Sequence, residues 1–215
     1  MTYNRSMVRT PVLGYLPFVL LVSLAACSNK QSPSSDAASS DPQAPATYQA
    51  RLETSKGPVV VEVNRNWAPR GADRFYALIK SGFYDQARFF RVVPGFIMQF
   101  GMAANPVDNA KWAEAEIKDD PVVQHNVKGT LSFAARGPNT RTSQIFINLG
   151  DNTGSLDPQG FAVFGRVIQG MDLVEQFYSA YGETPQQPLI AQRGNAYLMD
   201  GFPMLDYIQK ATVKP

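Results

Sequence analysis

The sequence is poor in the side chains that metal and disulfide chemistry require. It contains one cysteine, Cys27, and one histidine, His125. A lone cysteine cannot form a disulfide within the chain, and one histidine with one cysteine cannot build a common zinc site. His125 lies in a polar stretch, which indicates a surface or turn residue. We therefore expect no bound metal and no cofactor.

An excess of charge of one sign is also missing. The chain has 20 Lys and Arg residues against 18 Asp and Glu residues. Arg5 and Arg9 lie in a segment that we expect to be removed, so the remaining chain, with 18 basic and 18 acidic residues, is close to neutral. It lacks the basic surface that nucleic acid binding requires. The sequence also has no Gly-x-Ser-x-Gly elbow and no glycine-rich phosphate loop, which argues against hydrolase and nucleotide-binding functions.

The apolar run near the start of the chain, residues 12–22, is too short for a membrane span. A transmembrane helix needs about 20 apolar residues, and this run also carries Gly14 and Pro17. Two arginines precede it and small residues follow it, which is typical of a secretory signal. We interpret residues 1–26 as a signal peptide.

The segment Leu24-Ala-Ala-Cys27 ends this signal and resembles the bacterial lipobox, in which the cysteine is lipidated and becomes the new N-terminus. A buried structural cysteine is the alternative, but the position after an apolar run favours lipidation. Several acyl chains would anchor the protein stably, whereas one chain gives marginal binding. The resemblance implies a lipoprotein of the bacterial envelope, and the non-acidic Ser28 favours the outer membrane, facing the periplasm. Met1 and Met7 both remain candidate start residues.

Residues 28–47 are rich in Ser, Ala, Pro, Gln and Asp and lack large apolar side chains. This composition is typical of disorder. With the lipidated Cys27 they form the expected tether, residues 27–47. The remaining residues, 48–215, suit one domain with one hydrophobic core.

Short strands separated by turn residues dominate this domain, together with two helical patterns. We expect strands at residues 48–54, 59–63, 89–100 (a pair or a bent strand), 131–135, 144–149, 162–167 and 206–213, and helices at residues 69–81 and 170–181. This pattern favours a mainly β fold, either a closed antiparallel barrel or a sandwich.

Three segments in a fixed order narrow this choice. They are Phe89-Phe-Arg-Val-Val-Pro-Gly-Phe-Ile-Met-Gln99, Gly129-Thr-Leu-Ser-Phe-Ala-Ala-Arg-Gly-Pro-Asn-Thr-Arg-Thr-Ser-Gln-Ile-Phe-Ile-Asn148 and Phe161-Ala-Val-Phe-Gly-Arg-Val-Ile-Gln-Gly-Met171. Together they resemble the signature of the cyclophilin family of peptidyl-prolyl cis-trans isomerases. The resemblance implies a closed eight-stranded antiparallel barrel capped by two α-helices, with the active groove on its outer wall. It covers residues 48 to about 181 and places the tail from Gly182 only loosely.

The resemblance also implies the site. Arg91 matches the catalytic arginine of the family, and Gln99 is assigned with it. A guanidinium stays charged and has a fixed donor geometry, so it can bond the imide nitrogen while the X–Pro bond is twisted. The implied substrate-binding residues are Phe96, Ile97, Phe146 and Leu156 around the proline ring, Gln144 in the groove, Ala134 and Ala135 at its backbone-pairing edge, and Phe161.

Several of these assignments have alternatives. Without the resemblance, the four apolar residues around the proline ring would be interpreted as core, and Arg91 as a solvated strand arginine. The family often has Asn where Ala135 stands. One extra residue between Leu156 and Val163 means that the groove histidine of the family aligns with Phe161 or with Gly160.

We therefore expect a monomeric isomerase that accelerates rotation of X–Pro bonds in unfolded or flexible polypeptides of the bacterial envelope. Its partners would be proline-containing polypeptides and, through Cys27, a membrane. The alternative is a chaperone or scaffold lipoprotein that binds proline segments with negligible turnover. Arg91 favours the enzyme, because binding needs the pocket but not a donor that acts in the transition state.

Overall fold

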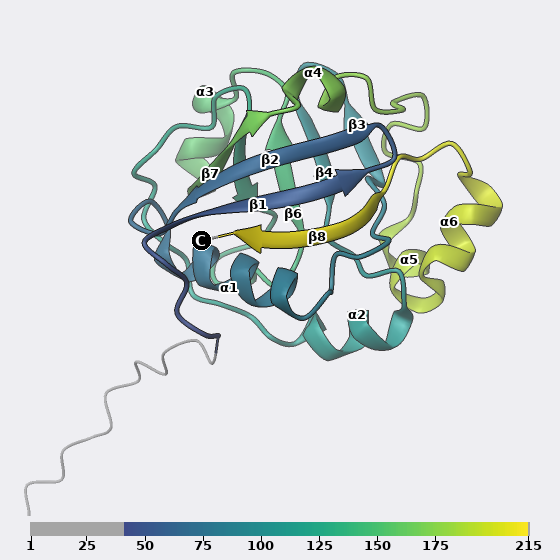
Figure 1. Ribbon diagram of the computed structural model, residues 1–215, viewed down its shortest axis with the longest axis horizontal. Helices are drawn as coiled ribbons and strands as arrows, with labels where there is room; N and C mark the ends of the chain where they lie inside the picture. The colour runs from purple at the N-terminus through teal and green to yellow at the C-terminus, as the bar shows by residue number, and fades with distance from the viewer. Residues whose placement is uncertain (1–40, 215) are drawn as a thin grey trace, which may run out of the picture. The chain divides into compact units, whose positions relative to one another are not determined.

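Eight antiparallel strands form one curled sheet within residues 41–214, the part of the chain that the computed structural model describes (Figure 1). The strands are β1 (Thr47–Thr54), β2 (Gly57–Asn64), β3 (Arg91–Val93), β4 (Ile97–Phe100), β5 (Thr130–Phe133), β6 (Ile145–Asn148), β7 (Val163–Gln169) and β8 (Ile208–Lys214). The helices are α1 (Pro69–Lys80), α2 (Pro106–Ala113), α3 (Thr153–Leu156), the 3-10 helix η1 (Asp157–Gln159), α4 (Met171–Val174), α5 (Gln187–Arg193) and α6 (Asn195–Gly201). The mainly β class and the expected strands are confirmed. The proposed signal peptide and Cys27 lie outside the described residues.

The expected closure of the barrel is not supported, because the sheet is open. Its strand order is β3-β4-β6-β5-β7-β2-β1-β8, so β3 and β8 are its edges. Among the described residues these edges share no ladder, and only an isolated bridge between Arg88 and Tyr207 connects the segments before them. The reason is that β3 is three residues long, and its Val92 N–H donates to the Gly182 carbonyl at 3.4 Å rather than to β8. The result is a curled sheet with a single seam.

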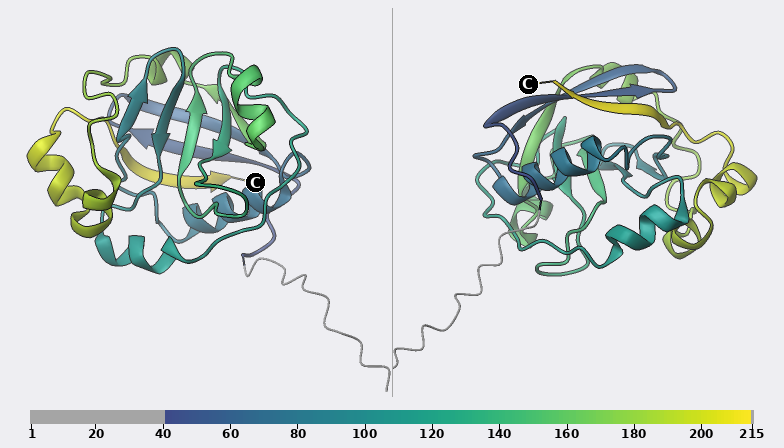
Figure 2. Two further views of the ribbon diagram at one scale, coloured as in Figure 1. Left: turned by 180° about the vertical axis from the view of Figure 1, so that it is seen from behind. Right: turned by 60° about the horizontal axis from the view of Figure 1, so that its bottom comes forward.

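The first expected helix is confirmed as α1, which lies against one face of the sheet (Figure 2). Pro69 occupies its start, where a missing N–H breaks no helical hydrogen bond. Phe75 and Leu78 are fully buried on its inner face, and the Phe75 ring lies 5.1 Å from that of Phe164 on β7. The helix ends at Lys80, with Ser81 as its C-terminal cap.

The second expected helix is wrong in length, since α4 spans four residues rather than residues 170–181. After Val174 the chain tightens, and the Phe177 N–H donates to the Val174 carbonyl at 3.2 Å. The next N–H, that of Tyr178, donates instead to a carboxylate oxygen of the buried Asp206 at 2.8 Å. A contact with a distant residue therefore ends a helix that the local spacing favours.

The folded part also begins before the expected boundary between residues 47 and 48. Asp41 accepts a hydrogen bond from Arg74 on α1 at 2.7 Å, and both side chains are buried, at 4% and 3% exposure. The Ala44 N–H donates to Asp73 at 2.8 Å. Residues 41–46 therefore form an N-terminal strap that fastens the chain to α1 before β1 begins.

The tail that the sequence placed only loosely contains two helices, α5 and α6, which lie to one side of the sheet, with α5 against α2 (Figures 1 and 2). They belong to a C-terminal helical segment, residues 182–205. Gly194 joins them with a φ of 55°, and a Cβ there would lie 2.2 Å from the Ala104 carbonyl oxygen. The segment packs through a second apolar cluster, made of Phe90, Met102, Ile190, Leu198 and Leu205. No helix in residues 41–214 is long and apolar enough to cross a membrane.

Candidate active site

Three buried apolar side chains gather on the face of the sheet that does not carry the main core. They are Ile97 on β4, Phe146 on β6 and Leu156 on α3. Successive side chains of a strand point to opposite faces, and the neighbours Met98 and Ile147 accordingly point into the main core. Half-buried residues pack against these three side chains: Phe96, Ala134 and Phe161. The structure thus brings together all four residues assigned to the proline ring, along with two of the remaining assigned residues.

A row of polar side chains lies along the same face. Arg91 on β3 is paired in register with Gln99 on β4, and its Nη1 donates to Gln99 Oε1 at 3.2 Å. Gln99 Nε2 in turn donates to Gln144 Oε1 at 2.7 Å. The guanidinium carbon lies 5.7 Å from the centroid of the Phe96 ring. Arg91 therefore stands at the border between the polar row and the apolar cluster.

The remaining assigned residues lie close by. The Ala134 N–H donates to the Gln144 carbonyl at 2.9 Å, so this edge is already paired within the chain. Ala135 does not join the apolar cluster; it lines a neighbouring pocket of about 210 Å³ together with Gly160 and Phe161. The rings of Phe161 and Phe146 are 5.6 Å apart in an edge-on arrangement. The packing thus favours Phe161 over Gly160 at the position of the groove histidine.

Buried asparagine amides hold the backbone of the apolar cluster through hydrogen bonds, and the sequence analysis did not identify them. Asn152 Nδ2 donates to the Phe96 carbonyl at 2.8 Å, and Asn126 Nδ2 donates to the Phe161 carbonyl at 2.8 Å. Asn148, which is fully buried, lies between them and bonds to both. Buried polar groups that are fully hydrogen-bonded rigidify their surroundings. The available signal was Asn148 itself, a polar residue that ends an otherwise apolar strand.

The amide network includes one carboxylate, Asp157. Burial would raise its pKa, but hydrogen bonds from Asn126 and His125 lower the pKa below its ordinary value. His125 Nδ1 lies 2.7 Å from the Asp157 carboxylate, and the histidine side chain is 74% exposed. The interpretation of His125 as a surface residue is confirmed.

Comparison with known proteins agrees with this arrangement. The profile of the family described as cyclophilin type peptidyl-prolyl cis-trans isomerase/CLD matches residues 49–193. A peptidyl-prolyl cis-trans isomerase of Acinetobacter baylyi is 35% identical over 157 residues, which cover 67% of this chain and 82% of that protein. Peptidyl-prolyl cis-trans isomerase CYP18-2 of Arabidopsis thaliana is 34% identical over 147 residues, with 66% and 87% covered.

The fold has a solved counterpart as well. The crystal structure of a cyclophilin type peptidyl-prolyl cis-trans isomerase of Cryptosporidium parvum superposes with a TM-score of 0.59 at 23% identity, and the match covers 79% of this chain and 98% of that one. From the family match, the curated relatives and the shared fold, we conclude that this chain belongs to the cyclophilin-type family of peptidyl-prolyl cis-trans isomerases.

Proposed function

We propose that this protein accelerates rotation about X–Pro bonds in unfolded or flexible polypeptides of the bacterial envelope. The observation that carries the proposal is the position of Arg91, a charged donor beside an apolar cluster that suits a proline ring. Rotation disrupts amide conjugation, and the imide nitrogen gains a lone pair that Arg91 can bond. Such a bond forms mainly in the transition state, so it raises the rate rather than the affinity alone.

The magnitudes show that Arg91 does not act alone. Uncatalysed X–Pro rotation takes tens to hundreds of seconds, so millisecond turnover needs about 10⁵-fold acceleration, or about 7 kcal/mol. One preorganised donor supplies about 2.7–4 kcal/mol. The remainder falls to the apolar cluster, which excludes water and thereby strengthens the interaction with the guanidinium, and to the amides that fix Phe96 and Phe161.

Turnover separates this function from the alternative of a proline-binding chaperone or scaffold. In a protease-coupled assay on a short X–Pro peptide, we expect a catalytic efficiency above about 10⁴ M⁻¹ s⁻¹, the lower end for ordinary enzymes. Peptide binding measured by calorimetry on the same sample provides the comparison. Binding without acceleration would favour the chaperone or scaffold.

We further propose that the protein is a lipoprotein anchored through Cys27 to a membrane of the bacterial envelope, the outer membrane on the periplasmic side. The support is the segment Leu24-Ala-Ala-Cys27 after an apolar run, followed by the small, non-acidic Ser28. The described domain begins no later than Asp41, so the residues between Cys27 and Asp41 would serve as the spacer.

Replacing Cys27 with serine is expected to abolish lipidation, because the variant lacks the thiol to which the lipid would be attached. Metabolic labelling with a tagged fatty acid in a bacterial host should mark the wild type and leave Cys27→Ser unlabelled. Isomerase activity of the purified variant should be unchanged, since the site lies wholly within residues 41–214. Equal label in both proteins would refute the anchor.

A further inference from the structure

The C-terminal helical segment, residues 182–205, touches the active site at two points. Glu183 Oε1 accepts a hydrogen bond from Arg91 Nε at 2.6 Å and lies 2.5 Å from Arg91 Nη2. Gln187, at the start of α5, accepts a hydrogen bond from Gln144 Nε2 at 3.1 Å. The polar row of the site therefore runs through five side chains, and its two ends belong to a segment that the sequence had placed only loosely.

The contacts of the guanidinium show how Arg91 is held. A guanidinium carries five N–H donors in a fixed plane. Glu183 accepts a hydrogen bond from the Nε donor and lies within ion-pair distance of Nη2, and Gln99 accepts a hydrogen bond from one Nη1 donor. Within residues 41–214, the other donors on the two terminal nitrogens make no hydrogen bond. Glu183 thus fixes one edge of the guanidinium and leaves donors available for a substrate.

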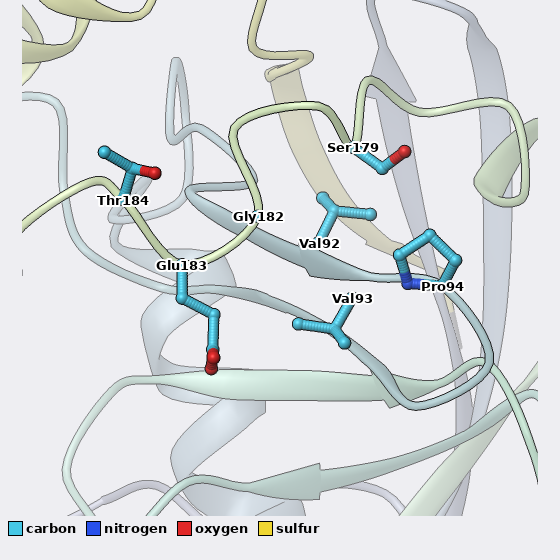
Figure 3. Close-up of a pocket in the computed structure, with 7 residues that line it drawn as sticks. All are labelled: Val92, Val93, Pro94, Ser179, Gly182, Glu183 and Thr184. Carbon is cyan, nitrogen blue, oxygen red and sulfur yellow. The ribbon is translucent and has the colours of Figure 1, made fainter.

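Hydrogen-bonded turns hold the loop that carries Glu183 in position beside β3. The Gly182 N–H donates to the Ser179 carbonyl and the Thr184 N–H donates to the Tyr181 carbonyl, both at 2.9 Å. The loop is also bonded to β3, since the Val92 N–H donates to the Gly182 carbonyl at 3.4 Å, and both line a surface pocket of about 500 Å³. In Figure 3 the Glu183 side chain points to the same side of the strand as Val93. Alternation along a strand puts Arg91 on that side too.

We propose that Glu183 is a positioning residue for the isomerase reaction, which fixes the Arg91 guanidinium in the orientation that donates to the substrate. Glu183 acts through Arg91. Its carboxylate is 64% exposed and Arg91 is 26% exposed, and ion pairs of this kind contribute little to folding stability. The contact therefore has its effect on the geometry of the donor, where small misplacements lower rates strongly.

The first test compares two substitutions by the same protease-coupled assay, and it rests on the isomerase function proposed above. Glu183→Ala should lower kcat/KM about tenfold, because the guanidinium loses one of its two fixed edges. Glu183→Gln keeps a neutral acceptor of about half the strength and should lose only about threefold. Glu175→Ala is the matched control: it removes another exposed carboxylate, paired with Lys128 away from the site, and should leave the rate unchanged.

The second test asks whether Glu183 acts through Arg91. In an Arg91→Ala background, adding Glu183→Ala should change the rate less than about twofold, because coupled residues are not additive. The NMR signal of the Arg91 Nε–H should also shift and exchange faster with solvent in Glu183→Ala, a readout that does not depend on turnover. Full activity of Glu183→Ala, a rate above wild type, a loss that persists without Arg91, or an unchanged Nε–H signal would overturn the proposal. A wild type that lacks turnover would contradict the proposed function instead, and the Nε–H signal would still decide the contact.

Discussion

Arg91→Ala is expected to lower kcat/KM by about 10²–10³, the loss that follows removal of one preorganised transition-state donor. The side chain is bonded to Glu183 and Gln99 at the surface of β3, so its removal leaves the core intact. The protease-coupled assay gives the rate, and circular dichroism with thermal unfolding shows whether the variant is folded.

Two further variants sharpen this prediction. Arg91→Lys keeps the charge but replaces the planar fork by a single flexible ammonium, and we expect it to be impaired as well. Arg166→Ala removes an exposed arginine of β7 whose side chain bonds to Glu62, and it should retain the wild-type rate. If Arg91→Ala turned over like the wild type, the assignment of the catalytic donor would be wrong.

Asp120→Ala is expected to destabilise the fold by about 3–5 kcal/mol, because it removes the buried carboxylate that pairs with the buried Arg141 guanidinium. The Asp120 side chain is fully buried, and it accepts hydrogen bonds from the Gly71 N–H at 2.9 Å and from Arg141 Nη1 at 3.0 Å. It also lies at the start of α1, where a negative charge is favourable. Domains of this size have about 5–15 kcal/mol of stability in total, so the loss would be a large share.

Urea unfolding of the purified protein measures this effect, with the slope of the transition compared between variants. Asp119→Ala is the matched control, since that neighbouring side chain is 36% exposed and also contacts Arg141. We expect Asp119→Ala to change the free energy of unfolding by no more than about 1 kcal/mol. If both substitutions lowered the free energy of unfolding equally, burial of the Asp120 carboxylate would not be the source of the stabilisation.

Local signals in the sequence predicted those parts of the fold that local chemistry determines. The helix expected at residues 69–81 is α1, and the strands expected at residues 48–54 and 59–63 pair as β1 and β2. Predictions from the sequence were wrong where a residue far away in the chain determines the local structure. The end of α4 depends on a hydrogen bond from Tyr178 to Asp206, and nothing near residue 178 signals it.

The site shows the same division. The structure brings Arg91 close to the apolar residues that the resemblance assigned to the same site, and these residues come from the segments that carry the family signature, except Leu156. Glu183 was missed because it is 92 positions from Arg91 in the chain and follows the region where the resemblance is clear. Asn126 and Asn152 were missed because their partners are backbone carbonyls of other segments, which no pattern of side chains reveals.

The N-terminal strap has a mechanical consequence. β1 lies between β2 and β8 inside the sheet, so tension reaching its first residue would act on its hydrogen bonds to both neighbours. The strap bears that tension first, because the buried ion pair between Asp41 and Arg74 lies before β1 in the chain. From there the load passes into α1 and the core that it covers. Tension applied from the N-terminal side would therefore load this ion pair and α1 before it reached β1.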